Sequence, residues 1–196
     1  MTDKETLDAY ASRVEDYKAM VKAEPAGSLV AFADALPPGG RVLDLGCGPG
    51  HAARYLAQRG FETHAWDASP EMVSAAAAPG VQTRVAVFED LTESAYFDGI
   101  FASFSLLHAP RTAFKGHMAA IARALTARGV LHLGLKTGTG EERDSIGRFY
   151  SYFTRTEILT ALEDNGLDSV WEHEGEEMGL AGTMAPFILV RAVKRG

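Results

Sequence analysis

The chain begins with a helical pattern of apolar positions. Over residues 3–24, side chains with apolar bodies recur at spacings of three and four, the period of one helix face; they are Leu7, Tyr10, Val14, Tyr17 and Val21. A second helical pattern covers 28–36 and ends where residues 37–40 read PPGG, a sequence that stops helices. We therefore expect residues 1–36 to form N-terminal helices.

From residue 41 onward, short apolar runs alternate with helical patterns. The runs predict strands over 41–45, 61–66, 84–88, 99–104, 130–135, 167–172 and 187–193. Helices are expected over 50–59, from Ser69-Pro70 onward, over 112–128, and after Thr154, which has capping-box spacing to Glu157. Strands that alternate with helices predict the α/β class, with a parallel sheet covered on both faces.

Composition narrows the class of protein. The chain has 196 residues, 46% of them hydrophobic, and a single cysteine, so we expect one domain over 1–196 without disulfides. The first residues lack a secretory pattern and no apolar run approaches the ~18 residues of a membrane span, so we expect a cytoplasmic protein without a membrane partner. The net charge of −7 argues against a nucleic-acid partner, and the scattered histidines argue against a metal site.

The most informative stretch is residues 42–50, which read VLDLGCGPG. A buried strand runs into a turn with three glycines, and a helix follows at once. Glycine permits positive φ and removes the Cβ that would keep a ligand from the main chain, so a nucleotide-like ligand can lie against this turn. A dinucleotide fingerprint needs glycine at position 51, where the chain has His51, and Asp44 precedes the turn. A nicotinamide-dependent oxidoreductase is therefore the weaker interpretation.

The glycine turn resembles motif I of the class I methyltransferases that use S-adenosylmethionine, and the resemblance covers residues 40–135. It implies a Rossmann-like, doubly wound, mostly parallel seven-stranded sheet with 40–135 as the cofactor-binding core and 136–196 on the substrate side. In that family the acidic residue before the glycines organises the loop and the methionine end of the cofactor, a place that Asp44 occupies. The implied contacts of the turn itself are Gly46, Cys47 and Gly48.

The resemblance implies further cofactor contacts after the next two strands. Asp67 matches the residue that accepts hydrogen bonds from both ribose hydroxyls, a role that suits the two oxygens of a carboxylate. Ala68 adjoins it, and Met72 resembles the family's apolar contact to adenine. After the third strand, where the family places an acidic residue near the adenine amino group, the chain reads Glu89-Asp90-Leu91, and either acidic residue matches.

The fourth strand leads into a segment where a substrate is expected. Ligands of open α/β sheets bind beyond the carboxyl ends of the strands, so this segment faces the same crevice as the glycine turn. Residues 106–108 read LLH and are similar to a stretch found in small-molecule methyltransferases. The resemblance implies that Ser103 and Phe104, just before this stretch, flank the cofactor. His108 is the candidate catalytic residue, with three open roles: a base, a substrate contact or a hydrogen-bonded neighbour.

Residues 136–153 form the second substrate candidate, which we expect to be a long loop. Basic and aromatic side chains gather there, namely Lys136, Arg143, Arg148, Tyr150 and Tyr152. Arginine suits a carboxylate or phosphate, and aromatic rings suit a flat substrate body. The alternative is a solvated loop whose cations pair with Glu141, Glu142 and Asp144.

The N-terminal helix resembles the tyrosine-containing lid of small-molecule methyltransferases. Tyr10 is expected to face the substrate, and Arg13 and Tyr17 the cofactor. A plain amphipathic helix packed on the sheet explains the same spacing.

These patterns together favour methyl transfer from S-adenosylmethionine to a small-molecule acceptor, with an acidic group as one candidate feature of the acceptor. Such a transfer is an in-line displacement in which alignment can supply roughly 7–11 kcal/mol, so a strong base is optional. The alternatives are a noncatalytic protein that binds S-adenosylmethionine and, less favoured, the oxidoreductase. A nucleic-acid methyltransferase would need a broad basic face.

Overall fold

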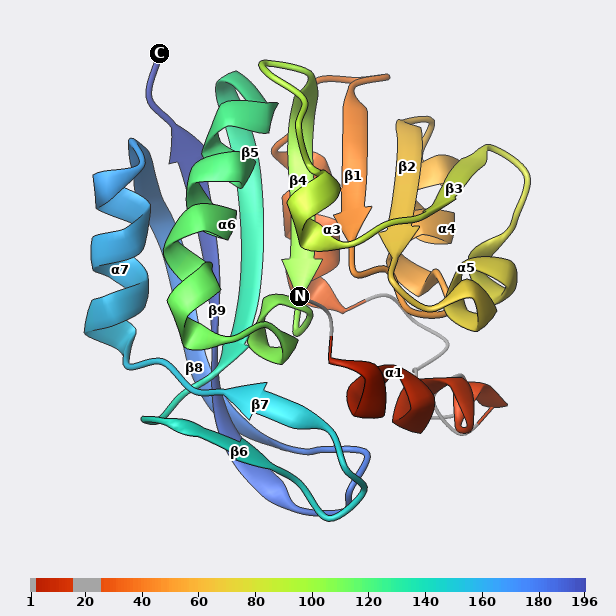
Figure 1. Cartoon of the computed structure of the whole chain (residues 1–196). Coiled ribbons are helices and arrows are strands. Elements are labelled where there is room, and N and C mark those ends of the chain that lie inside the picture. Colours follow the sequence, from red (N-terminus) through yellow and green to blue (C-terminus); the bar gives the residue numbers. More distant parts are fainter. Residues whose placement is uncertain (1–2, 16–25) are drawn as a thin grey trace.

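The computed structural model describes residues 3–15 and 26–196 and is built around one seven-stranded sheet (Figure 1). The strand order is β3-β2-β1-β4-β5-β9-β8, in which β1 to β5 are parallel and β9 pairs antiparallel with both β5 and β8. The strands are β1 (Arg41–Leu45), β2 (Glu62–Asp67), β3 (Val81–Val85), β4 (Phe97–Ser103), β5 (Leu125–Lys136), β8 (Leu167–Met178) and β9 (Met184–Lys194). This arrangement confirms the predicted α/β class and the mostly parallel, doubly wound sheet.

Helices cover both faces of the sheet. α6 (Arg111–Ala124) and α7 (Arg155–Asp164) lie on one face, and α3 (Gly27–Asp34) and α4 (His51–Gln58) on the other (Figure 1). α5 (Pro70–Ala76) follows β2 and begins at Ser69, whose hydroxyl oxygen accepts the Met72 N–H as an N-cap. α7 carries the predicted capping box between Thr154 and Glu157.

The central strands are buried on both sides because successive side chains point to opposite faces. Leu43 and Ile100 pack with the α6 residues of the larger core, whereas Val42 and Phe101 pack with Phe32 of α3. This is why β1 and β4 have almost continuously apolar sequences.

The order of the strands creates a crevice between β1 and β4. β1 lies between β2 and β4, so the connections that follow β1 and β4 leave toward opposite halves of the sheet. The carboxyl ends of these two strands therefore border an open space, where ligands of doubly wound sheets bind.

Several element boundaries differ from the sequence predictions, and β8 runs to Met178, beyond the predicted end at residue 172. β3 begins three residues early, and α6 stops at Ala124 because Leu125 pairs with Phe97 and starts β5. The segment 136–153 contains a hairpin of β6 (Glu141–Arg143) and β7 (Phe149–Ser151), where the sequence predicted a loop. β6 is exposed throughout and so lacks the apolar alternation by which a strand is recognised.

The N-terminal helix is shorter than predicted in the described residues. α1 (Lys4–Ala11) begins at Asp3, whose carboxylate accepts the Thr6 N–H at 2.8 Å as an N-cap. The predicted segment 3–24 continues into residues 16–24, which lie outside the described residues.

Candidate functional site

A cleft opens at the carboxyl ends of the strands, between the sheet and α1. Its walls come from the turns after β1, β2 and β4, from the segment after β3, and from α1, α5 and α6. The lining residues are Asp3, Thr6, Leu7, Tyr10, Leu45, Gly46, Gly48, Asp67, Ala68, Ser69, Met72, Ala86, Val87, Phe88, Glu89, Ser103, Phe104, Ser105, His108, Ala109 and His117. The crevice that the topology predicts is therefore a cleft lined by distant parts of the sequence.

The glycine turn is packed so closely against the turn after β4 that no side chain fits at position 46. Gly46 has a φ of 76°, and a Cβ built there would lie 2.2 Å from the Ser105 Cβ. The N–H groups of Gly46 and Cys47 both donate to the Trp66 carbonyl, at 2.8 and 2.9 Å. These bonds join the turn to β2. Cys47 is buried against α4 and the sheet and does not line the cleft.

Asp44 lies beneath the turn rather than in the cleft. Its Oδ2 accepts the Ala53 N–H at 3.0 Å, which binds the end of β1 to the first turn of α4. Burial raises the pKa of this carboxyl to about 7. The predicted organising role for the loop fits this position, whereas a direct cofactor contact is not seen in the lining residues.

Asp67 does face the cleft, at the end of β2. Its two oxygens accept main-chain N–H bonds at 2.9 Å, one from Gly48 and one from Ser69. Burial raises the pKa of Asp67, and the same N–H bonds oppose that shift because they favour the anion. Ala68 and Met72 follow it along the same wall. The carboxylate is thereby oriented by the glycine turn, and each oxygen has further lone-pair capacity toward the cleft.

The segment after β3 supplies the next part of the wall. Phe88 and Glu89 line the cleft, whereas the Asp90 carboxylate accepts the Val87 N–H at 2.9 Å and Leu91 lies in the core. Of the two acidic residues that the sequence left open, Glu89 is the one at the cleft. His117 of α6 also lines it, and its ring lies 5.3 Å from that of Phe88.

The sequence analysis did not single out His117, Asp3 or Thr6. His117 occupies a buried helix face together with Phe114 and Ile121, so a polar residue within that apolar stripe was the available clue. Asp3 and Thr6 had no comparable clue, because N-capping alone explains them.

The turn after β4 forms the other end of the cleft. Ser103 and Phe104 line it, and Phe104 adopts a φ of 55°, which is unusual for a residue with a side chain. The Ser105 hydroxyl donates to the Leu45 carbonyl at 2.6 Å. This bond holds the ends of β1 and β4 together.

His108 is held on both ring nitrogens. Nδ1 lies 2.7 Å from the Phe149 carbonyl, and Nε2 lies 2.8 Å from the Tyr10 hydroxyl. Burial lowers the pKa of His108 to about 4, so the ring is neutral near pH 7. In this arrangement His108 is a weak base that links α1 to β7.

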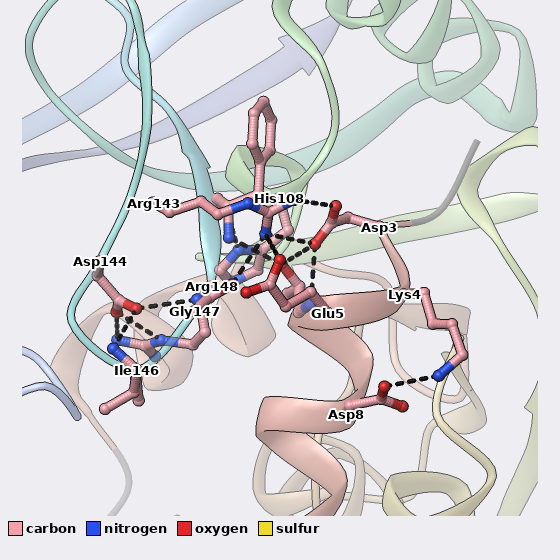
Figure 2. A network of polar contacts seen from close by, with 12 residues as sticks. Asp3, Lys4, Glu5, Asp8, His108, Arg143, Asp144, Ile146, Gly147 and Arg148 are labelled. Atoms are coloured by element: carbon pink, nitrogen blue, oxygen red, sulfur yellow. Dashed lines mark hydrogen bonds and ion pairs between the residues drawn. The ribbon is translucent and has the colours of Figure 1, made fainter.

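The basic residues of the substrate side pair with carboxylates of the chain, and none of them lines the cleft. Arg143 donates to both Asp3 oxygens, at 2.9 and 2.7 Å, as Figure 2 shows. Arg148 lies 2.7 Å from Asp144 in a buried ion pair, and the Lys136 ammonium lies 3.0 Å from Glu177.

The other predicted site residues that the structure describes lie away from the cleft. Tyr150 packs its ring 4.8 Å from His108, and the Tyr152 hydroxyl donates to Glu142 at 2.7 Å. Arg13 donates to the Ala9 carbonyl and the Ser12 hydroxyl, and Tyr17 lies outside the described residues. Neither Arg13, Tyr150 nor Tyr152 lines the cleft.

In residues 3–15 and 26–196, no helix combines the length and the apolar character of a membrane span. In the same part of the chain, no three His, Cys, Asp or Glu side chains are grouped as metal ligands.

The chain shares three features with the class I methyltransferases: a doubly wound seven-stranded sheet, a glycine turn after its first strand and an acidic residue at the end of the second. The comparison with known families agrees, because residues 42–129 match the family described as "Methyltransferase domain". This match supports the resemblance to the class I S-adenosylmethionine-dependent methyltransferases that the sequence predicted.

The curated relatives match a limited stretch. Trans-aconitate 2-methyltransferase of Mycobacterium tuberculosis is 54% identical over 52 residues, which are 26% of this chain and 20% of the relative. The chain thus spans about a fifth of the length of the first curated relatives it matches.

Two solved structures share the fold over nearly the whole chain. The Burkholderia thailandensis 1,6-didemethyltoxoflavin-N1-methyltransferase, with bound 1,6-didemethyltoxoflavin and S-adenosylhomocysteine, has a TM-score of 0.75 at 21% identity and covers 98% of this chain and 88% of its own. The [4+2]-cyclase SpnF has a TM-score of 0.74 at 16% identity and covers 95% of this chain and 93% of its own. The fold is therefore shared by proteins named for different reactions.

Proposed function

We propose that this protein transfers a methyl group from S-adenosylmethionine to a small-molecule acceptor. The observation that carries the proposal is the position of Asp67. Its carboxylate is oriented by Gly48 and Ser69 in the cleft that also contains Phe104 and His108. One end of the cleft thus suits a nucleoside, and the end with Phe104 and His108 is where we place the acceptor.

The residues present fit the proposed cofactor. Gly46 and Gly48 line the cleft with main-chain atoms, which the methionine end can approach closely, and Asp67 offers two oxygens to two ribose hydroxyls. Met72 and Phe88 provide apolar contacts for the base, and Glu89 provides an acceptor for its amino group. S-adenosylmethionine would supply an electrophilic methyl group, because the bond from that group to the sulfonium sulfur can break with neutral S-adenosylhomocysteine as the leaving group.

The protein's own contribution is alignment and exclusion of water. Holding two reactants in line accounts for roughly 7–11 kcal/mol in well-oriented pairs, so a strong base is not required. His108 fits this role as an orienting group because both its nitrogens are engaged and its pKa is low. Thr6, Leu7 and Tyr10 of α1 shield the cleft from solvent.

The finer proposal concerns an acidic acceptor, and Arg143 is the residue that supports it. Its side chain is 40% exposed, and its guanidinium holds Asp3 at the cleft wall and also lies 3.3 Å from Glu5, so we propose that an anionic group of the acceptor exchanges with Asp3 at the same fork. The name of the curated relatives, trans-aconitate 2-methyltransferase, also favours an acidic acceptor. Arg148 and Lys136 are less available because both are buried in ion pairs.

Calorimetry with S-adenosylmethionine and S-adenosylhomocysteine tests the cofactor. We expect both to bind, and Asp67→Ala to weaken binding by about 1–3 kcal/mol, the range for a lost hydrogen bond to a charged group. Equal dissociation constants for the folded variant and the wild type would show that Asp67 does not contact the cofactor.

A mass-spectrometric screen of metabolites for a 14-dalton gain, the mass that a methyl group adds in place of hydrogen, tests the transfer. Binding of S-adenosylmethionine without any methylated product across acidic and neutral acceptors would favour a noncatalytic binding protein. With an acceptor in hand, Arg143→Gln should raise its KM and leave cofactor affinity unchanged.

A further inference from the structure

We propose that Arg148 is a positioning residue of the cleft: it orients the Tyr10 hydroxyl against His108 and so holds α1 across the bound cofactor. The inference rests on the proposed function for the identity of the cofactor and on the geometry of the described residues for the rest. It gives Arg148 a role through its neighbours instead of direct contact with a substrate.

The three residues form a chain of hydrogen bonds that joins separate elements. Arg148 Nη1 donates to the Tyr10 oxygen at 3.1 Å, and the Tyr10 hydroxyl lies 2.8 Å from His108 Nε2. His108 Nδ1 lies 2.7 Å from the Phe149 carbonyl. The chain therefore begins and ends in the β6–β7 hairpin, and it passes through α1 and the turn after β4.

The chemistry of the partners fixes the direction of each bond. A carbonyl only accepts, so the Phe149 oxygen requires the proton of His108 to be on Nδ1. A neutral imidazole then has a lone pair on Nε2, which must accept from Tyr10. Because a guanidinium only donates, Arg148 occupies an acceptor position of the Tyr10 oxygen and leaves its proton for His108. The Tyr10 hydroxyl thus has one preferred orientation.

Arg148 is itself rigidly held. Asp144 accepts from its Nε at 2.9 Å and lies 2.7 Å from its Nη2, and the other Asp144 oxygen accepts the Arg148 main-chain N–H at 2.9 Å (Figure 2). The guanidinium also lies between the rings of Tyr10 and Tyr150, 5.3 and 5.1 Å from their centroids. Arg148 is 4% exposed, so these contacts are shielded from water.

Two further contacts bind the same helix to the same hairpin. The Phe149 N–H donates to the Thr6 hydroxyl oxygen at 2.8 Å, and Arg143 holds Asp3. Thr6, Leu7 and Tyr10 line the same cleft as Asp67, so a ligand held there lies against α1. Of these contacts, the hydrogen-bond chain from Arg148 through Tyr10 is the one that includes His108.

The first test is ¹⁵N NMR of the histidine rings in the full chain without any ligand. We expect His108 to carry its proton on Nδ1 and to show a hydrogen-bonded lone pair on Nε2. Tyr10→Phe and Arg148→Met should both shift the Nε2 resonance, and Arg148→Lys should restore part of the wild-type value. A wild-type proton on Nε2 would overturn the proposal.

The second test measures the release rate of S-adenosylhomocysteine by stopped flow. Tyr10→Phe and Arg148→Met should each accelerate release by about tenfold, the effect of one lost hydrogen bond in a buried network. Because Arg148 acts through Tyr10, Arg148→Met should add little in the Tyr10→Phe background. Independent, multiplying effects would refute a role through Tyr10.

Matched variants separate positioning from general destabilisation. Tyr96→Phe removes a partly exposed hydroxyl before β4, and Arg155→Met breaks an exposed ion pair with Glu172; neither should change the release rate. If Arg148→Met does not fold, Tyr10→Phe and Arg148→Lys still decide the outcome. If S-adenosylhomocysteine fails to bind the wild type, the proposed function is wrong. The NMR experiment needs no ligand, so it still tests the hydrogen-bond chain on its own.

Discussion

At the scale of single residues, the two carboxylates beside the glycine turn have different tasks. Asp44 is buried beneath the turn and binds β1 to α4, whereas Asp67 faces the cleft. The sequence predicted a cofactor role for both through the resemblance of the glycine turn to motif I of the class I methyltransferases. It did not separate the structural role from the cleft-facing one, because that difference depends on which side of the turn each carboxylate lies.

Gly46 provides a prediction at this scale. Gly46→Ala should destabilise the protein more than Gly60→Ala, although both positions have positive φ angles of 76° and 88°. Each substitution incurs roughly 1–2 kcal/mol for a left-handed L-residue. Only Gly46 adds a collision, with Ser105, because a Cβ at Gly60 meets nothing within 4 Å. We expect a further loss of about 1–3 kcal/mol at Gly46.

Urea unfolding of both variants measures the difference in their free energies of unfolding. Equal losses would mean that Ser105 moves aside without cost. In that case the close packing of the β1 and β4 turns would not be what excludes side chains from position 46.

At the scale of elements, apolar periodicity predicted the buried strands and failed for the β6–β7 hairpin. β1 and β4 are recognisable because both faces are covered. The hairpin is instead held by polar contacts between residues distant in sequence, such as Asp3 with Arg143. The sequence left two interpretations open for the basic residues of 136–153, contact with a substrate or pairing with nearby carboxylates such as Asp144. Arg148 is found paired with Asp144, whereas no local pattern encodes the pairing of Arg143 with Asp3.

β5 provides a prediction about pH. His132 stacks on Phe101 with ring centroids 4.4 Å apart, and within the described residues neither ring nitrogen has a hydrogen-bond partner. Burial lowers the pKa of His132 to about 3, so between pH 6.5 and 3 the unfolded chain binds a proton that the folded chain does not. Stability is therefore lost as the pH falls, by about 1.4 kcal/mol per pH unit from this group.

His132→Phe removes that loss while keeping a ring against Phe101. The variant should gain stability relative to the wild type as the pH is lowered from 7.5 to 5, because Asp44 and His108 titrate alike in both proteins and cancel in the difference. Guanidinium unfolding at three pH values measures this. A pH-independent difference between the two proteins would contradict the assignment of His132 as a buried neutral histidine.

At the scale of the whole molecule, the cleft exists because the sheet is wound in two directions. β1 to β3 contribute the wall with Asp67, and β4 contributes the wall with Phe104 and His108. The sequence predicted both walls from the order of strands and helices. The third wall is α1, for which the sequence left two interpretations open, a lid or a plain packed helix. Tyr10 lines the cleft, and Tyr17 lies outside the described residues, so the lid stays a prediction.

A ligand that contacts all three walls should stabilise the folded state of the entire chain. At a concentration one hundred times its dissociation constant, S-adenosylhomocysteine should add about 2.7 kcal/mol to the free energy of unfolding. For a chain of this length that corresponds to a rise in Tm of roughly 5–10 °C. Differential scanning calorimetry measures the shift.

At the same ligand concentration the shift in Tm should be smaller in Asp67→Ala, whose affinity for S-adenosylhomocysteine is lower. NADH should produce no shift, because position 51 lacks the glycine of the dinucleotide fingerprint. A rise with NADH equal to that with S-adenosylhomocysteine would instead indicate a cleft that selects only for a nucleoside, and the glycine turn would no longer distinguish methyl transfer from hydride transfer.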